Sequence, residues 1–422
     1  MAPRNRPADT SLSSIDERHR PLRHAAKPPA ATWTRSQGWS GRRRSRAIAA
    51  VAVTAAGGAL VLATTASLPA GAATARPTPR ASVLWVEPGS QAAVTVRTWT
   101  TTRPARTAEL ALLTAIANQS QGTWVTAGLS AGAARARVAN ASIAAAGAGQ
   151  MPTFVLYALP HLDCRNAGIG TAAGYRAWIN QVRLGLESRP AIVVIEPDSL
   201  AMLSCLPATQ ASERLALLRY AVTTLSADPL ASVYLDAGHN GWQSSSTMAS
   251  RLTSAGVAVA RGFTLNVSNF GHTDVEVAYG RRISAKLAQP RPFIVDVSRN
   301  GLGPDTGPLA WCNPPGRALG QPPTTRAIDP QVDALLWVKP PGESDGVCRP
   351  GEPSAGRFWL DYALGLARRS PWANPAPLPT DPTSTPTPTP PTTPTGPTTP
   401  TPTTPTDPPA PTDIPTPPTP TG

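Results

Sequence analysis

Short runs of apolar and β-branched residues recur along the middle of the chain, and they predict β-strands. These runs lie at 83–86, 153–159, 191–195, 232–235, 262–267, 292–297 and 334–338, with a further short candidate at 122–125. Most of them are apolar almost continuously rather than in alternation. That pattern predicts a sheet with both faces covered, as in parallel sheets.

Helix-like stretches lie between several of the runs. In 175–186 the apolar residues Trp178, Val182 and Leu186 fall near one face, and 211–225 and 274–287 are similar. Strands that alternate with helices predict parallel βα units. The span 81–372 also fits the size of an α/β barrel. We therefore predict an α/β fold, a (β/α) barrel of seven to eight parallel strands.

Composition divides the chain into three parts. Residues 1–80 form a basic leader with 13 Lys and Arg against 3 Asp and Glu, whereas residues 373–422 contain no Lys or Arg and are rich in Pro and Thr. Such a Pro/Thr tract cannot bury a core, so we expect an extended, disordered linker tail. The catalytic domain is then expected at 81–372.

The leader has the pattern of a secretory signal. A basic cluster, RRRSR at 42–46, precedes an apolar run at 47–66, and A-x-A sites follow at 70–75. The run is just long enough to span a bilayer, so an uncleaved anchor stays open as an alternative. Both interpretations place the rest of the chain outside the cytoplasm, secreted or associated with the cell envelope. No stable membrane insertion is expected if the leader is cleaved.

Cysteine usage and charge exclude some classes of function. The four cysteines form no CxxC pair, which disfavours a zinc site; two disulfides are expected, with three connectivities open. Much of the net charge of +13 lies in the leader, and no Lys/Arg stripe is interleaved with stacking aromatics. We therefore expect no nucleic-acid partner, no metal and no cofactor.

Acidic side chains gather just after the predicted strands. Asp163, Asp198, Asp236, Asp296 and Asp345 each end or follow one of the runs. The carboxyl ends of barrel strands share one face, which carries the chemistry in such folds. The sequence therefore predicts one acidic site built from loops far apart along the chain.

Several carboxylates without a metal-ligand set favour general acid/base hydrolysis, with glycoside cleavage as the leading case. One carboxylic acid protonates the leaving oxygen and a second carboxylate helps water attack. Neighbouring like charges raise the pKa of the acid. Sugar faces pack on indole rings, and the chain has 11 Trp but only 5 Phe. Core packing is the alternative for each of the strand-end tryptophans, Trp85, Trp124, Trp242, Trp311 and Trp337.

Seven motifs, in order, resemble glycoside hydrolase family six, the inverting cellulases. They are VLYALPHLDC (155–164), VIEPDSLAML (194–203), YLDAGHNGW (234–242), GFTLNVSNF (262–270), FIVDVSRNGLGP (293–304), WCNPPGRALG (311–320) and WVKPPGESDG (337–346). The resemblance runs from about 83 to 367. It implies a distorted, partly open barrel.

The resemblance also implies catalytic roles. Asp198 matches the general acid, and Asp163 matches an aspartate that raises the pKa of the acid and orders the attacking water. Asp345 matches the candidate general base, with a water chain through Asp163 as the alternative. A structural ion pair of Asp345 with Lys339 or Arg299 is also open. Asp236 matches an aspartate that supports the acid, and a structural hydrogen-bonding role is its alternative.

Further residues match positions that contact the sugar. Tyr157 matches a residue that crowds the distorted sugar ring. Substrate-binding or supporting positions are matched by Trp124, His239, Asn269, Arg299, Trp311, Lys339 and Glu343. Trp242 joins them as a strand-end indole. The family pairs its cysteines as Cys164–Cys205 and Cys312–Cys348.

This chain departs from the family pattern at three positions. Leu162 stands where Arg is usual, so less positive charge is expected beside Asp163, which should lift nearby carboxylate pKa values. Glu87 stands where Asn is frequent and adds a charge near the cleft, and Leu302 also replaces a frequent Asn. None removes a proposed catalytic aspartate.

The function expected from the sequence is that of a secreted, monomeric endo-β-1,4-glucanase acting on a β-glucan polysaccharide with inversion. The connections 237–262 and 311–334 are short, which favours an open cleft and internal cleavage. Two alternatives remain: a non-catalytic glucan-binding or cell-wall protein on a decayed enzyme scaffold, and a chain-end cellobiohydrolase.

Overall fold

A computed structural model of the protein describes residues 79–80, 82–165, 167–326 and 328–374. The predicted signal at 42–75 and the Pro/Thr tract after 374 lie outside the described residues. Among the helices of the described part, none is both long and apolar enough to cross a bilayer.

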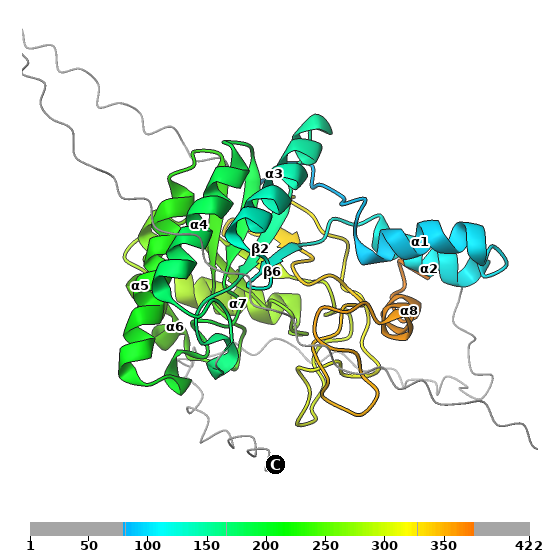
Figure 1. Ribbon diagram of the computed structural model, residues 1–422. Coiled ribbons are helices and arrows are strands. Elements are labelled where there is room, and N and C mark those ends of the chain that lie inside the picture. The colour runs from blue at the N-terminus through cyan, green and yellow to red at the C-terminus, as the bar shows by residue number, and fades with distance from the viewer. Residues whose placement is uncertain (1–78, 81, 166, 327, 375–422) are drawn as a thin grey trace, which may run out of the picture. The chain divides into compact units, whose positions relative to one another are not determined.

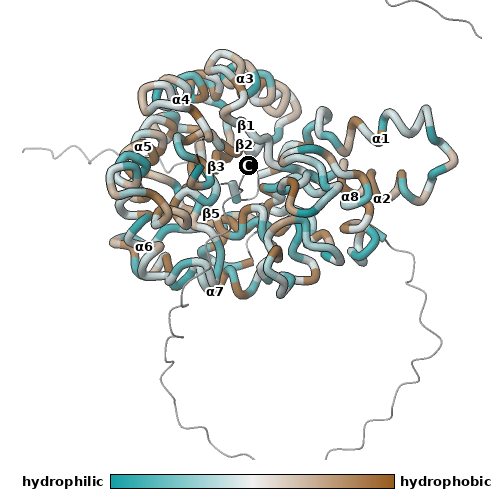
Figure 2. Tube along the Cα trace, turned by 60° about the horizontal axis from the view of Figure 1, so that its bottom comes forward, coloured by the Kyte–Doolittle hydropathy of each residue, from teal (hydrophilic) through white to brown (hydrophobic). Residues whose placement is uncertain are grey.

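Seven strands form one parallel sheet whose spatial order follows the chain. They are β1 Thr123–Thr126, β2 Thr153–Tyr157, β3 Ala191–Ile195, β4 Ala231–Asp236, β5 Gly262–Leu265, β6 Phe293–Asp296 and β7 Val332–Leu336. The sheet curls into a barrel, which Figure 2 shows end-on. The predicted α/β barrel with seven to eight parallel strands is confirmed.

The two edges of the curled sheet approach each other but do not form a ladder. The Gly122 N–H, just before β1, donates to the Trp337 carbonyl just after β7 over 2.8 Å. A Cβ atom on Gly122 would lie 2.3 Å from the Val338 carbonyl oxygen, so only glycine allows this approach. The barrel is therefore partly open, as predicted.

Five helices surround the outer face of the barrel (Figures 1 and 2). They are α3 Ala131–Gly147, α4 Ala172–Leu186, α5 Ala208–Ser226, α6 Ser245–Ser254 and α7 Thr273–Ser284. The close packing of α3 on α4 depends on Gly185, where a Cβ atom would meet the Arg135 carbonyl oxygen at 2.7 Å.

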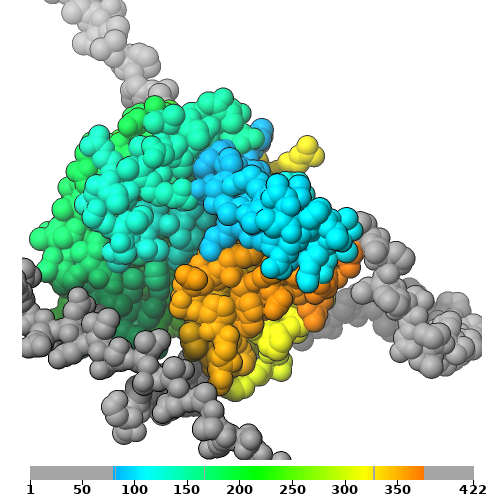
Figure 3. Space-filling view, turned by 45° about the vertical axis from the view of Figure 1, so that its right-hand side comes forward, coloured from blue at the N-terminus to red at the C-terminus, as the bar shows by residue number. Residues whose placement is uncertain are grey.

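A second helical group stands beside the barrel. It contains α1 Gln91–Thr102, α2 Thr107–Ala117 and α8 Leu360–Arg368. Figure 3 shows the blue-to-cyan surface of α1 and α2 against the orange segment that leads into α8. This group anchors the loop that follows β7, which carries part of the site described below.

In most strands the side chains are buried on both faces of the sheet; β1 at the edge is buried on one face and partly buried on the other. In β3, Ile192 and Val194 join an inner cluster with Tyr234, whereas Ala191 and Val193 join the larger core between sheet and helices. Doubly covered strands explain the near-continuous apolar runs in the sequence. The prediction of a parallel sheet covered on both faces is confirmed for these strands.

The predicted elements differ from the observed ones in two ways. The run 83–86 forms no strand and contributes only a single parallel bridge from Leu84 to Met151. Pro88 follows shortly after, and proline cannot donate to a ladder. The predicted helices at 175–186, 211–225 and 274–287 correspond to α4, α5 and α7, whereas α1, α2, α3, α6 and α8 were not predicted.

Candidate active site

Asp198 follows β3 and is fixed through its backbone by Asp236, the last residue of β4. The Asp198 N–H donates to Asp236 Oδ1 over 2.9 Å, and the Gly238 N–H donates to the same oxygen over 3.0 Å. Asp198 has a φ of 68°, a left-handed conformation that is uncommon for aspartate. Asp236 therefore holds the strained backbone position of Asp198 at the carboxyl end of β3.

The surroundings of Asp198 oppose its ionisation. Burial raises the pKa of Asp198 well above its ordinary value, and the carboxylates of Asp236, Asp163 and Asp345 raise it further, against the opposing charge of Lys339. Burial also raises the pKa of Asp236 to about 7. Groups that interact this way lie close together, so the predicted acidic residues converge on one place.

Asp163 lies in a short 3₁₀ turn, Leu162–Cys164, after β2. Its side chain is exposed and accepts a hydrogen bond from the Tyr157 hydroxyl. Burial and the charge of Asp163 raise the pKa of Tyr157, so the phenol stays a donor. His161, Asp163 and Cys164 all have positive φ values, of 57°, 52° and 57°. Such strained backbone is typical of functional loops.

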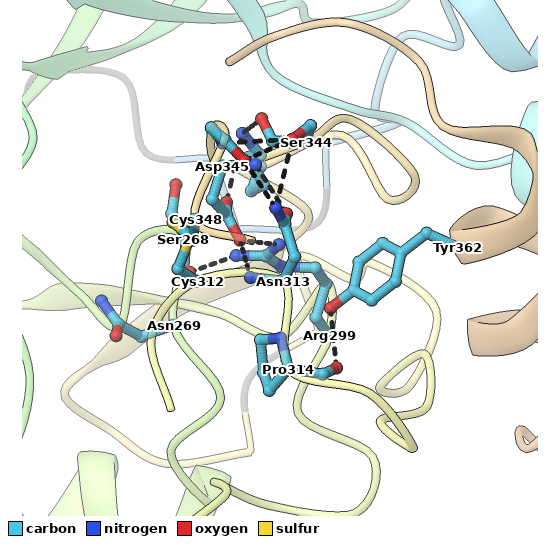
Figure 4. Close-up of polar contacts among 12 residues, drawn as sticks. Ser268, Asn269, Arg299, Cys312, Asn313, Pro314, Ser344, Asp345, Cys348 and Tyr362 are labelled. Atoms are coloured by element: carbon cyan, nitrogen blue, oxygen red, sulfur yellow. Dashed lines mark hydrogen bonds and ion pairs between the residues drawn. A yellow bond between two sulfur atoms is a disulfide. The ribbon is translucent and has the colours of Figure 1, made fainter. Parts of the chain in front are cut away.

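Asp345 lies in the loop after β7 and has the opposite environment. Its Oδ2 accepts from Arg299 Nη1 at 2.7 Å and from the Asn313 N–H at 3.0 Å (Figure 4). Lys339 Nζ lies 3.4 Å from Oδ1. Burial alone would raise the pKa of Asp345, but the charges of Arg299 and Lys339 outweigh it and hold the pKa below its ordinary value. Both ion pairs left open as a structural alternative are present.

Asp296, at the end of β6, ties the loops on either side of it. Its Oδ2 accepts from the backbone N–H of Ser268 and of Lys339, each over 3.0 Å, and its Oδ1 accepts from the Ser298 N–H. The side chain is fully buried. Asp296 is thus part of the scaffold that places Arg299 and Lys339 beside Asp345.

Three of the expected sugar-contacting residues lie together. The ring of Trp124 meets that of Tyr157 edge-on, with centroids 5.6 Å apart, and Lys339 Nζ lies 5.7 Å from the Trp124 centroid. Glu343 lies on the same loop as Asp345 and accepts from Gln91 Nε2 at 2.5 Å. Burial raises the pKa of Glu343 above its ordinary value.

The other flank of the site carries His239, Trp242 and Asn269. The rings of His239 and Trp242 are 5.2 Å apart, and burial lowers the pKa of His239. Asn269 Nδ2 donates to the Val267 carbonyl over 3.0 Å. Their partly buried side chains are consistent with either contact to a ligand or support of the loops.

The tryptophans divide into two groups. Trp311 is 56% exposed, and Trp124 and Trp242 are partly buried. Trp85 and Trp337 are 7% and 1% exposed and belong to the core, so for these two the core-packing alternative is correct.

The disulfides pair as the resemblance implies, Cys164–Cys205 and Cys312–Cys348. The first joins the loops after β2 and β3, and the second joins the loops after β6 and β7. Cys312, Cys348 and Glu352 are the one group in the described chain with metal-ligand proximity. Its sulfurs are in a disulfide and offer no thiolate to a metal.

Sequence reasoning missed three supporting residues. Asn313 holds Asp345 from both sides, because its Oδ1 also accepts from the Asp345 N–H over 2.8 Å. Its position directly after Cys312 was the available signal. Glu196 and Arg214 are the other two.

The Leu162 side chain is buried, and Arg214 interacts electrostatically with Asp163. Arg214 thus supplies positive charge near Asp163 although Leu162 carries none.

Together, the fold and the site define a parallel α/β-barrel protein with a group of aspartates at the carboxyl ends of its strands. The sequence model of Glycosyl hydrolases family 6 matches residues 80–370. The chain belongs to this family.

Two curated relatives and one solved structure are particularly similar. Endoglucanase A from Cellulomonas fimi is 38% identical over 293 residues, covering 69% of this chain and 62% of that protein. Endoglucanase 1 from Streptomyces halstedii is 38% identical over 318 residues, covering 73% and 95%. The endoglucanase Cel6 from Mycobacterium tuberculosis, solved with a thio-linked cello-oligosaccharide, is 47% identical with a TM-score of 0.66. That match covers 69% of this chain and 99% of the solved one. This chain thus spans less than two thirds of the Cellulomonas protein.

Proposed function

We propose that the protein is an endo-β-1,4-glucanase that hydrolyses internal bonds of cellulose or a related β-glucan with inversion. The observation that carries the proposal is the contrast between two carboxyl groups in one site. The pKa of Asp198 is raised and that of Asp345 is lowered. A site with one protonated and one ionised carboxyl has the acid and the base that inverting hydrolysis needs.

In the proposed reaction, Asp198 gives its proton to the glycosidic oxygen as the bond from that oxygen to the anomeric carbon breaks. A water molecule attacks the anomeric carbon from the opposite face and loses a proton. Asp345 receives this proton directly, or through water ordered by Asp163. We expect the Asp198 and Asp345 carboxyl groups to be separated by roughly 6.5–9.5 Å, which leaves room for that water.

The substrate class follows from the site and the relatives. Trp124 and Trp311 offer indole surface for sugar rings, and Tyr157 lies against both Trp124 and Asp163. Relatives named endoglucanase, and a neighbour solved with a thio-linked cello-oligosaccharide, favour a β-1,4-glucan. The short connections after β4 and β6 favour an open cleft and internal cuts.

Release of reducing sugar from a soluble cellulose derivative tests the hydrolase activity. The wild-type protein is expected to be active and Asp198→Ala inactive, with the exposed Asp274→Asn of α7 as a control that keeps its activity. Equal inertness of wild type and Asp198→Ala, with retained glucan binding, would favour the non-catalytic alternative.

Two further readouts test the finer claims. NMR of the first products should show the inverted anomer, and a retained anomer would overturn the proposed mechanism. An early fall in the viscosity of carboxymethyl-cellulose is expected from internal cuts. Sugar release without that fall would identify a chain-end enzyme.

We also propose that the protein is exported and acts as a monomer, with 1–80 as a leader and 373–422 as a linker. The basic cluster and apolar run at 42–66 support export. Fractionation of expressing cells tests this: the protein should appear in the medium or the envelope. Retention in the cytoplasm would contradict export, and sedimentation would reveal a dimer.

A further inference from the structure

The loops that carry Asp163 and Asp198 have an unusual backbone. Non-glycine residues with positive φ occur in both: His161, Asp163 and Cys164 in the first, and Glu196 and Asp198 in the second. Each such residue is disfavoured on its own, so the surroundings must hold it in place. The contacts that do so also fix the distance between the two carboxyl groups.

Arg214 contacts both loops at once. It projects from the middle of α5 and is only 3% exposed. One end of its guanidinium, Nη2, donates to the His161 carbonyl, two residues before Asp163. The other end, Nη1, donates over 3.2 Å to the Ser199 carbonyl, directly after Asp198. A planar guanidinium fork sets the spacing of its two acceptors.

Glu196 holds the same two loops from the other side. It directly follows β3, two residues before Asp198, and its carboxylate accepts from the backbone N–H groups of Ala158 and Leu159, at 2.9 and 3.2 Å. The Tyr175 hydroxyl donates to it over 3.0 Å. Arg214 and Glu196 also interact electrostatically, although both are buried. A carboxylate and a guanidinium thus join the loops after β2 and β3 at separate points.

We propose that Arg214 and Glu196 are positioning residues that lock the loops of Asp163 and Asp198 to each other and thereby set the geometry of the catalytic carboxyl groups. This inference rests on the proposed function of Asp163 and Asp198. Neither residue reaches the carboxyl oxygens of the two aspartates through a hydrogen bond in the described structure; both act through backbone groups. Their effect should therefore fall on the rate of the chemical step rather than on substrate binding.

Arg214→Met is the main test, because methionine keeps much of the side-chain volume and removes both donors. Displacement of a catalytic group by about 1 Å can cost on the order of 100-fold in rate. We expect kcat on a soluble cello-oligosaccharide to fall roughly 10- to 100-fold, with KM little changed. Arg214→Lys keeps the charge and one donor, and should recover part of the loss.

Arg219→Met is a matched control. Arg219 lies five residues further along α5, about 1.4 turns. It also donates to a backbone carbonyl, that of Ser254, away from Asp163 and Asp198. Its replacement should leave kcat unchanged. If Arg214→Met folds and keeps wild-type kcat, or if Arg214→Lys is no better than Arg214→Met, the positioning role is wrong.

Hydrogen exchange gives a readout that needs no substrate. Amide exchange in 158–165 should become faster in Arg214→Met and in Glu196→Gln than in the wild-type protein, whereas α7 should keep its protection. Unchanged exchange in 158–165 would overturn the inference even if Arg214→Met proved too unstable for kinetics. An inactive wild-type protein with faster exchange in the variants would instead count against the proposed function alone.

Discussion

The two sides of the site use the same residue type under opposite conditions. On the side formed by β3 and β4, Asp198 and Asp236 lie next to each other, and burial together with like charge raises the pKa of Asp198. On the side formed by β6 and β7, Asp345 lies between Arg299 and Lys339, which hold its pKa low. The neighbours of the two aspartates thus shift their pKa values in opposite directions, which is what the proposed acid and base require.

The two sides of the site also differ in how their aspartates affect the stability of the fold. Asp345 is paired, so its charge contributes to the stability of the loop after β7. Asp198 has no such ion pair among the described residues. It is buried beside the carboxylates of Asp236 and Asp163, so its ionisation is unfavourable. In the proposed reaction, the same environment keeps the proton of Asp198 available to the substrate.

The largest expected effect is on the β3–β4 side. Asp198→Asn should lower kcat by about 10²- to 10⁴-fold, the usual contribution of a general acid. It should not destabilise the fold, because it removes a charge that the folded state disfavours. Kinetics and thermal unfolding of the variant check both parts. Near-normal kcat would show that the proton comes from elsewhere.

On the β6–β7 side the effect on stability should have the opposite sign. Asp345→Asn leaves Arg299 and Lys339 without their counter-charge, and loss of one member of a buried pair costs about 3–5 kcal/mol. Chemical denaturation should therefore show a clear loss of unfolding free energy, together with a loss of activity. Stability equal to that of Asp198→Asn would remove the contrast between the two sides.

The contributions of Asp345 and Asp198 to stability should also depend on pH in opposite ways. The folded pKa of Asp345 is depressed, so its contribution is present above its unfolded pKa and is lost as pH falls through the lower folded value. The folded pKa of Asp198 is raised, so its contribution is present at low pH and is lost as pH rises. Denaturation of each Asn variant across acidic pH should reveal these opposite differences from wild type. Parallel curves for the two variants would contradict the assignment.

A smaller effect is expected from Asp236→Asn. Asp236 is the leading charged neighbour that raises the pKa of Asp198. Its neutralisation should move the alkaline limb of the kcat/KM profile to lower pH, because the acid then loses its proton more readily. The Asn side chain still offers an oxygen to the Asp198 N–H. An alkaline limb that stays in place would rule out this coupling.

The smallest effect is expected from Lys339→Met. Lys339 lowers the pKa of both Asp198 and Asp345. Its removal should shift both limbs of the kcat/KM profile to higher pH, whereas the exposed Lys286→Met should shift neither. Movement of only one limb would mean that Lys339 faces only one side of the site.

The sequence predicted the sheet well because most of its strands are buried on both faces. The run at 191–195 is entirely apolar and coincides with β3. Two of the helices that were missed, α1 and α3, have weak apolar patterns. α3 is mostly alanine and packs through close backbone approach, and α1 is rich in threonine. Neither shows the wide apolar stripe on which helix prediction depends.

The positions of the acidic residues were also predictable, since strand ends meet at one face of a barrel. Their environments were predictable only in part: like charges around the acid were expected, and an ion pair of Asp345 was left open as an alternative. Arg299 follows β6 and Asp345 follows β7, and only the fold shows that the two are paired. Arg214 lies mid-helix, about 50 residues from His161, and nothing in the local sequence marks it as a contact of that loop.

The central claim is that, at one pH, Asp198 is protonated while Asp345 is ionised. Carbon-13 NMR of protein labelled at the aspartate carboxyl carbons measures this directly, with Asp198→Asn and Asp345→Asn used to assign the two signals. We predict that the Asp198 signal titrates well above the ordinary range for aspartate and the Asp345 signal below it. Titration of Asp345 at a higher pH than Asp198 would contradict the account.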